Sequence, residues 1–304
     1  EGFEVSAIET SVGSFSDKLL YPLEKVDKGT VFKIDDYIID NNGNITNISD
    51  IKHKNILVDK SINDVYFIED KAYLSCGFGI VLIDLKRMEI KETYIIGNNG
   101  SYLSVNDITL YNDKFYAATS EGIYYADYQN KNLVDFSQWT HDTTLIHADL
   151  NYSEIETFNN QLIANYSRNE YNTDTLFVYD GEKWDYHHYK IPSIKRSIRA
   201  YDDQLVLSNN YSITALGTDN SVIMTYNKNM EPFDCIYDKN GDAYWIADKT
   251  NSIYRFVPGK YFDPINFNGP YSNNVFELKV RGEQLWVAPG GYSSVWAKNW
   301  MKDG

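Results

Sequence analysis

The sequence contains little of what disulfide-rich folds, membrane spans and thiol chemistry require. Only two cysteines, Cys76 and Cys235, occur in 304 residues, too few for a disulfide framework and not spaced as a thiolate metal site. Two cysteines are compatible with an oxidising compartment. No apolar run reaches the roughly 18 residues that a helix needs to cross a bilayer. The chain begins at Glu1 without a methionine, so we expect a removed leader or a piece of a longer exported protein.

Basic residues are scarce as well. Lys and Arg number 28 against 43 Asp and Glu, which gives a formal net charge of −15. Such a field repels phosphate backbones, so nucleic acid is disfavoured as a partner. The Gly-x-Ser-x-Gly, P-loop and dinucleotide-binding patterns are missing, and the five histidines show no metal-ligand spacing. We therefore expect no cofactor, no metal and no enzymatic activity.

What the sequence has instead is a repeat of strand-forming residues. Tyrosine is abundant, at 26 residues, and long helical periodicity is absent, which favours strands. A polar turn residue followed by a short apolar strand recurs six times, in residues 70–75, 113–118, 160–165, 203–208, 242–247 and 283–288. The successive spacings are 43, 47, 43, 39 and 41 residues. A period of about 40–45 residues with three or four strands per unit is typical of propeller blades.

A third strand follows the repeated one in most units, and it ends in a turn residue in most of these. It is predicted for residues 79–84, 122–127, 175–180 and 252–257. A partial seventh unit is visible in residues 35–49. The sequence therefore predicts an all-β protein, a β-propeller of seven blades with three to four antiparallel strands each, and six blades as the alternative. No linker rich in proline or glycine divides the chain, so residues 1–304 are expected to form one domain.

Ligand-binding candidates come from two features. The first is a basic cluster in an acidic chain, which could hold an anionic group; its members are Lys190, Lys195, Arg196 and Arg199. The second is a pair of polar loops that carry Tyr102 and Tyr292 and that suit recognition at one mouth of the propeller channel. The competing interpretation of both features is a solvated loop without a role.

One stretch of the sequence resembles a known family. Residues 71–85 and 89–97 are similar to the N-terminal propeller of the PorZ family, a component of the type IX secretion machinery of Bacteroidetes. The similarity extends through residues 41–140, and residues 44–51, 59–64, 105–107, 116–124 and 132–139 carry it. Residues 288–291 look like the glycine turn near the end of that propeller. A looser similarity, around residues 119–125, links the chain to the regulator propellers of periplasmic hybrid sensor kinases.

The resemblance implies a non-catalytic scaffold or ligand-binding propeller in the periplasm or at the cell surface. A PorZ-like protein would assist the attachment of secreted proteins to an anionic lipopolysaccharide, with other secretion proteins or a glycan as partners. Family members carry further domains, so the chain is expected to be part of a longer protein. One alternative is the glycan-sensing domain of a two-component regulator. The other is a propeller-based carbohydrate-active enzyme, which would need two carboxylates converging at the channel mouth.

Overall fold

A computed structural model describes residues 45–249 apart from 168–173 and 191–193, residues 252–259, and the backbone of several strands outside these ranges. The chain divides into two compact units, Glu1–Pro264 and Ile265–Gly304. We describe each unit by itself. The expectation of a single domain over residues 1–304 stays a prediction.

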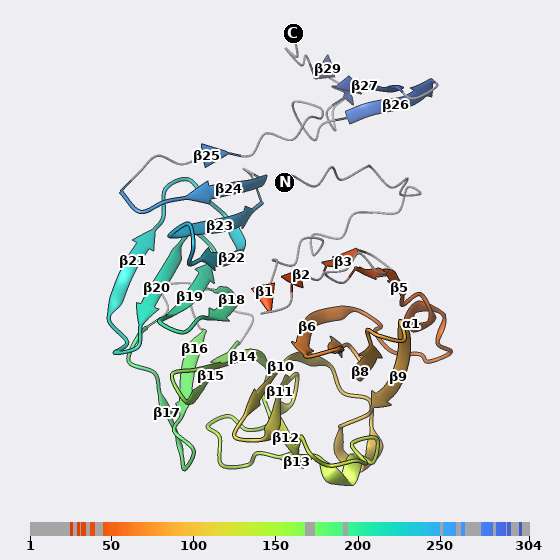
Figure 1. Ribbon diagram of the computed structural model, residues 1–304, viewed down its shortest axis with the longest axis vertical. Helices are drawn as coiled ribbons and strands as arrows, with labels where there is room; N and C mark the ends of the chain where they lie inside the picture. The colour runs from red at the N-terminus through yellow and green to blue at the C-terminus, as the bar shows by residue number, and fades with distance from the viewer. Residues whose placement is uncertain are drawn as a thin grey trace. The chain divides into compact units, whose positions relative to one another are not determined.

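Five four-stranded antiparallel sheets, blades 1 to 5, follow one another in the first unit (Figure 1). Blade 1 consists of β6 (Ile62–Ile68), β7 (Lys71–Cys76), β8 (Gly79–Asp84) and β9 (Glu89–Tyr94). Blade 2 consists of β10 (Val105–Tyr111), β11 (Lys114–Thr119), β12 (Gly122–Asp127) and β13 (Thr140–His141). Blade 3 consists of β14 (Tyr152–Phe158), β15 (Gln161–Tyr166), β16 (Thr175–Tyr179) and β17 (Trp184–Tyr186).

The last two blades repeat this order of strands. Blade 4 consists of β18 (Lys195–Ala200), β19 (Gln204–Asn209), β20 (Ile213–Gly217) and β21 (Val222–Tyr226). Blade 5 consists of β22 (Pro232–Asp238), β23 (Ala243–Asp248), β24 (Ser252–Phe256) and β25 (Asp263–Pro264). The first strand of each blade contacts the first strand of the next, so β6, β10, β14, β18 and β22 are the inner strands. The fourth strands are the outer ones.

The remaining described elements are short. The first unit also contains a pair of two-residue strands, β1 (Lys25–Val26) and β2 (Gly29–Thr30), and a three-stranded sheet of β3 (Phe32–Ile34), β4 (Tyr37–Ile39) and β5 (Ile45–Asn47). Single helical turns are α1 (Asp50–His53), η1 (Asn98–Gly100) and η2 (Phe136–Gln138). The second unit contains two antiparallel pairs, β26 (Val275–Arg281) with β27 (Gln284–Pro289) and β28 (Gly291–Tyr292) with β29 (Lys298–Asn299).

The all-β propeller is as predicted, but the predicted number of blades was wrong. The described residues form five blades, not seven or six. The sixth repeat, residues 283–288, falls in the two-stranded pair of β26 and β27, and the partial seventh, residues 35–49, falls in the three-stranded sheet. The repeat in the sequence marks a hairpin, and a hairpin becomes a blade only when outer strands pair with it. The sequence pattern therefore overcounts blades.

The hairpin turns explain why the repeated polar residues are needed. Asn112 and Asp113 between β10 and β11 have φ of 47° and 58°, and Asn159 and Asn160 between β14 and β15 have φ of 48° and 57°. Two successive positive φ values define the type I′ turn of tight hairpins, and Asn and Asp tolerate this region best after glycine. The predicted hairpin turns are confirmed in these blades.

The core lies between blades. Tyr73 and Ile80 of blade 1 pack with Phe115 and Ala117 of blade 2, and all four side chains are buried. Corresponding clusters join blades 2 and 3, blades 3 and 4, and blades 4 and 5. Both faces of the second and third strands are therefore covered, which explains their nearly continuous apolar sequences. Buried polar side chains on the inner strands include Asp107, Lys195, Ser197 and Asp234.

Candidate functional site at the propeller axis

The five inner strands share a β-bulge near their first residue. The pairing register shifts between Ile62 and Asp64 in β6, and equivalent shifts occur in β10, β14, β18 and β22. The residue after the bulge is acidic in four blades, as Asp64, Asp107, Glu154 and Asp234. Blade 4 has Ser197 at this position. Because a bulge redirects the side chains that follow it, a recurrent bulge brings equivalent residues together where inner strands converge.

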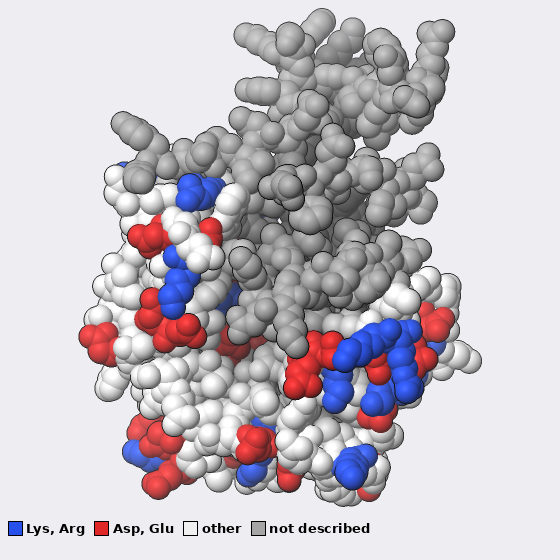
Figure 2. Space-filling model, viewed as in Figure 1, with Lys and Arg blue, Asp and Glu red and all other residues white. Residues whose placement is uncertain are grey.

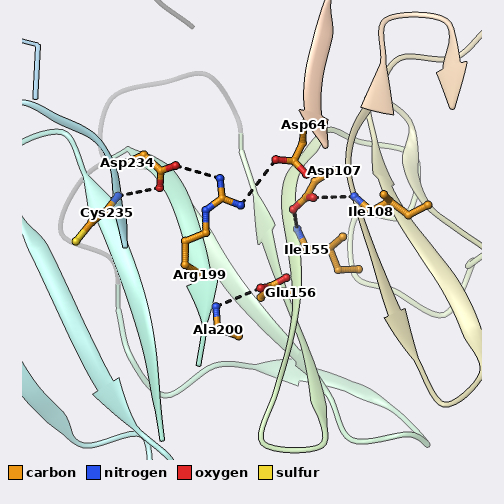
Figure 3. Close-up of polar contacts among 9 residues, drawn as sticks. All are labelled: Asp64, Asp107, Ile108, Ile155, Glu156, Arg199, Ala200, Asp234 and Cys235. Atoms are coloured by element: carbon orange, nitrogen blue, oxygen red, sulfur yellow. Dashed lines mark hydrogen bonds and ion pairs between the residues drawn. The ribbon is translucent and has the colours of Figure 1, made fainter. Parts of the chain in front are cut away.

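Arg199 of blade 4 lies between two of these carboxylates. Its Nη2 is 3.0 Å from Oδ2 of Asp234 in blade 5, and its Nη1 is 3.8 Å from Oδ1 of Asp64 in blade 1 (Figure 3). The three side chains are between 11% and 16% exposed. One guanidinium therefore joins the inner strands of blades 1, 4 and 5 in a largely dry environment, where charge-assisted contacts are strongest.

Carboxylates also accept backbone N–H groups from the next blade. Asp107 of blade 2 accepts the N–H of its neighbour Ile108 at 2.7 Å and that of Ile155 in blade 3 at 2.8 Å. Glu156 of blade 3 accepts the N–H of Ala200 in blade 4 at 3.1 Å. Figure 3 shows Asp64 beside Asp107, so contacts of the polar axis pass through all five blades. We use "polar axis" for Asp64, Asp107, Glu154, Glu156, Lys195, Arg199 and Asp234.

The bulge residues themselves form a second set of ties. The amide nitrogen of Asn63 donates to the carbonyl of Val105 at 2.7 Å, and that of Asn106 donates to the carbonyl of Tyr152 at 2.6 Å. In each case the acceptor is the first residue of the next inner strand. Arg196 is the bulge residue of β18, and its Nη1 donates to the carbonyl of Pro232, the first residue of β22, at 3.2 Å. A long cation here replaces the asparagine of blades 1 and 2.

Burial shifts the titration of the acidic side chains. Burial raises the pKa of Asp64, while the guanidinium of Arg199 opposes the rise. Burial and the charge of Asp64 raise the pKa of Asp107 well above its usual range. Burial also raises the pKa of Glu154 to about 7, although Lys195 and Arg199 lower it. Burial is the largest cause of each shift, because removal from water disfavours the charged form of a carboxyl group.

Lys195 is the other cation of the polar axis. Its side chain is only 4% exposed, and within the described part of the chain its Nζ has no hydrogen-bond partner. Burial lowers the pKa of Lys195 to about 8, while the nearby charges of Glu154 and Asp174 act in the opposite direction. The backbone N–H of Lys195 is satisfied by Asp174 Oδ2 at 2.9 Å. Lys195 therefore provides charge to the axis without a direct ion pair to any residue that the structure describes.

The structure distributes the six predicted ligand residues over different environments. Lys195 and Arg199 belong to the polar axis, and Arg196 ties blade 4 to blade 5 and packs with its guanidinium 4.5 Å from the ring centre of Phe233. Lys190 and Tyr102 are exposed. The side chain of Tyr292 lies outside the described residues. Of the four basic residues, only Lys195 and Arg199 therefore share the polar axis, and Arg199 and Arg196 are engaged by protein groups.

Sequence reasoning missed the acidic members of the axis. Asp64, Asp107 and Glu154 each precede the repeated turn residue by six positions, as does Ser197 in blade 4. The same offset in successive repeats is the signal that could have found them. Regularly spaced acidic residues also form turns, and that interpretation hid the shared offset.

Two other kinds of site can be assessed directly. Among the side chains that the structure describes, no three His, Cys, Asp or Glu residues are grouped so as to hold a metal ion. A cavity of about 360 Å³ lies over blade 1, away from the axis, and its apolar floor includes Ile51, Phe78 and Val81. Lys54 at its rim lies 5.5 Å from the ring centre of Phe78.

The comparison with known protein families matches the segment of the chain that contains blade 1 and almost all of blade 2. Residues 32–140 match the family model described as "TSS9, PorZ, N-terminal beta-propeller domain". This match confirms the resemblance predicted from residues 41–140. The PorZ-matching segment contains Asn63, Asp64, Asn106 and Asp107, and therefore the ties that begin in blades 1 and 2. Arg199 lies outside that segment.

Solved structures extend the comparison to most of the chain. PorZ of Porphyromonas gingivalis, described as an essential bacterial surface component of its type-IX secretion system, has a TM-score of 0.66 at 17% identity. The alignment covers 86% of this chain and 34% of that protein, so this chain spans about a third of its length. At this identity the similarity shows the fold alone.

Extracellular domains of two-component systems share the same fold. Those described for BT3049 and BT4673 of B. thetaiotaomicron have TM-scores of 0.55 and 0.54, each at 12% identity. The alignments cover 86% and 85% of this chain, and 37% and 36% of the respective proteins. No curated protein matches the chain. None of the described helices has the length and apolar character of a membrane span.

Proposed function

We propose that this chain is a non-catalytic, PorZ-like propeller that serves as a docking scaffold in type IX secretion and in the attachment of secreted proteins to the cell surface. The observation that carries the proposal is the PorZ family match of residues 32–140. The similarity in fold to PorZ over 86% of the chain supports it. The protein is exported and acts in the periplasm or at the cell surface, and its partners are other secretion proteins.

The polar axis supports a scaffold rather than an enzyme. Asp64 and Asp107 lie close together, which is the arrangement that a carbohydrate-active enzyme would use. However, Asp64 faces Arg199, and Asp107 accepts two backbone N–H groups. A catalytic carboxylate needs a lone pair or a proton that reaches a substrate. These two carboxyls are committed to joining blades.

An anionic lipopolysaccharide sugar is the proposed ligand, and the exposed members of the predicted set are the ones able to contact it. Lys190 can offer an ammonium group and Tyr102 a ring, because both are exposed. A glycan array probed at low and at physiological salt tests this proposal. We expect saturable, salt-sensitive binding that Lys190→Glu weakens, and no effect of Lys183→Glu, which changes an exposed lysine of blade 3. Equal binding by both variants would remove Lys190 from the site.

A glycan-sensing domain of a two-component regulator is the second candidate. The similarity in fold to the extracellular domains of BT3049 and BT4673 favours it. That similarity covers as much of the chain as the similarity to PorZ, but with lower TM-scores. It therefore ranks behind the secretion scaffold.

Deletion of the gene in the source bacterium separates the two candidates. A secretion scaffold predicts that type IX cargo is lost from the cell surface and that the wild-type gene restores it. A sensor predicts normal cargo attachment and a lost transcriptional response to a glycan. Normal attachment in the deletion strain would refute the proposed function.

A further inference from the structure

The outer strands of the five blades differ in how they protect their free edges. An edge strand presents unpaired N–H and C=O groups, and proteins blunt such edges with charge, proline or shortness. β13 and β25 have only two residues each, and β25 ends in Pro264. β17 has three residues, and its Asp185 forms an ion pair with Lys183 at 2.8 Å. β9 has six residues and carries Glu89, Lys91 and Glu92.

β21 of blade 4 has none of these devices. It is five residues long, Val-Ile-Met-Thr-Tyr, and contains neither a charge nor a proline. Val222 is 51% exposed and Ile223 is 56% exposed. Among the described strands, β21 pairs with β20 alone. Figure 2 shows white surface along much of the left edge, interrupted by a red patch, whereas Lys, Arg, Asp and Glu cover much of the surface over blade 1 at the right.

A matched position in blade 1 sharpens the contrast. In β9 the pairing with β8 skips Lys91, and in β21 the pairing with β20 skips Ile223. Both residues are therefore bulge residues of an outer strand, and both are exposed. A bulge and a charge each act against edge pairing. Blade 1 combines the two at Lys91, whereas blade 4 keeps the bulge but places the apolar side chain of Ile223 there.

The charges that flank β21 indicate what it pairs with. Asp219 precedes the strand and Lys228 follows it, and both are exposed. When a strand pairs antiparallel with its own copy, the start of each strand lies beside the end of the other. Asp219 of each protomer would then lie near Lys228 of the partner molecule. The two-fold axis between the two strands repeats every contact, so one complementary pair of charges occurs twice.

We propose that β21 is a self-association edge, through which two copies of this chain pair antiparallel to form an eight-stranded sheet from their fourth blades. This interface is separate from the proposed secretion role. Because each strand is short, the dimer is weak and depends on protein concentration.

Sedimentation velocity of the full chain over a range of concentrations tests the proposal. We expect a monomer–dimer equilibrium in the wild type and a dissociation constant at least about tenfold higher in Ile223→Lys, because two like charges meet across the edge. Met88→Lys, which places the same charge on another exposed apolar residue, is the control and leaves the equilibrium unchanged. Thermal melting verifies that both variants fold, and Val222→Glu is a second disruptive variant.

One outcome of these experiments supports self-pairing through β21, and two outcomes contradict it. A dimer that both edge variants abolish, with slower amide exchange of residues 222–226 in the wild type than in Ile223→Lys, supports self-pairing. A wild-type protein that is monomeric at every concentration overturns it, as would be the case if the edge served a strand of a different protein. A dimer that persists in both edge variants overturns it too, because the interface would then lie elsewhere.

Discussion

Arg199 of β18 and Asp64 of β6 meet at the propeller axis, with 3.8 Å between Nη1 and Oδ1, although 135 positions separate them in the sequence. Asp234, 35 positions after Arg199, completes the contact at 3.0 Å. Apolar packing joins each blade to its neighbours. Arg199 adds a link between the fourth blade and the first, across 135 positions of the sequence.

Removal of the Arg199 charge is predicted to be costly. Arg199→Met leaves Asp64 and Asp234 largely buried without their cation, and breaking one partner of a buried ion pair typically costs about 3–5 kcal/mol. We expect a loss of that order in urea unfolding at neutral pH. Arg87→Met is the control, because Arg87 and Glu89 form an exposed pair that contributes little. A change as small as that of the control would contradict the proposed role of Arg199.

The hydrogen bonds that asparagine side chains donate to the next blade can be removed by one substitution and introduced by another. Asn106→Ala deprives the Tyr152 carbonyl of its donor and should lower stability by about 1–2 kcal/mol. Ser153 occupies the same bulge position in β14, and its Oγ accepts a bond from Asn165 within blade 3. Ser153→Asn should gain about 1 kcal/mol by reaching the first residue of β18. Thermal unfolding measures the stability of both variants. The prediction requires Asn106→Ala to be less stable than the wild type and Ser153→Asn to be more stable.

The raised pKa of Glu154 predicts an unusual dependence of the free energy of unfolding on pH. Its folded pKa of about 7 exceeds the ordinary value of 4.5, so between these values the native state binds more protons than the unfolded one. The free energy of unfolding should therefore fall as pH rises from about 4.5 to about 7, by roughly 3 kcal/mol from this group. Glu154→Gln should flatten the profile. An equally steep profile in the variant would show that Glu154 is not responsible.

The lowered pKa of Lys195 predicts the opposite change at higher pH, a free energy of unfolding that increases with pH. Its folded pKa of about 8 lies below the ordinary value of 10.5, so the unfolded state binds more protons between these two values. The free energy of unfolding should rise as pH increases from about 8 to about 10.5. Lys195→Met should remove this rise, and Lys239→Met, at an exposed lysine, should keep it. Urea titrations at several pH values give the two slopes.

The sequence predicted the strands of the blades well because local chemistry determines them. The third strand of blade 1 was predicted for residues 79–84 and is observed as Gly79–Asp84, and that of blade 2 is observed as Gly122–Asp127. Both begin with a glycine at positive φ, where a Cβ would collide with a backbone carbonyl. Such requirements are encoded within a few residues, so the pattern of one blade reveals them.

The number of blades and the polar axis were not predicted, because both depend on contacts between distant segments. The sequence groups Lys195, Arg196 and Arg199, together with Lys190, as one basic cluster because they are close in sequence. In the structure the bulge in β18 gives them separate roles, as a buried charge, a tie to blade 5 and an ion-pair partner of two carboxylates. Only the offset of acidic residues from the repeated turns could have indicated those partners.

A double-mutant cycle on Arg199 and Asp64 tests the central claim that the polar axis joins blades distant in sequence. The four proteins are the wild type, Arg199→Met, Asp64→Asn and the double variant, each unfolded in urea at neutral pH. We predict a coupling energy of about 1 kcal/mol or more between the two positions. Effects that add to within about 0.3 kcal/mol would contradict the claim, because the two side chains would then stabilise their own blades independently.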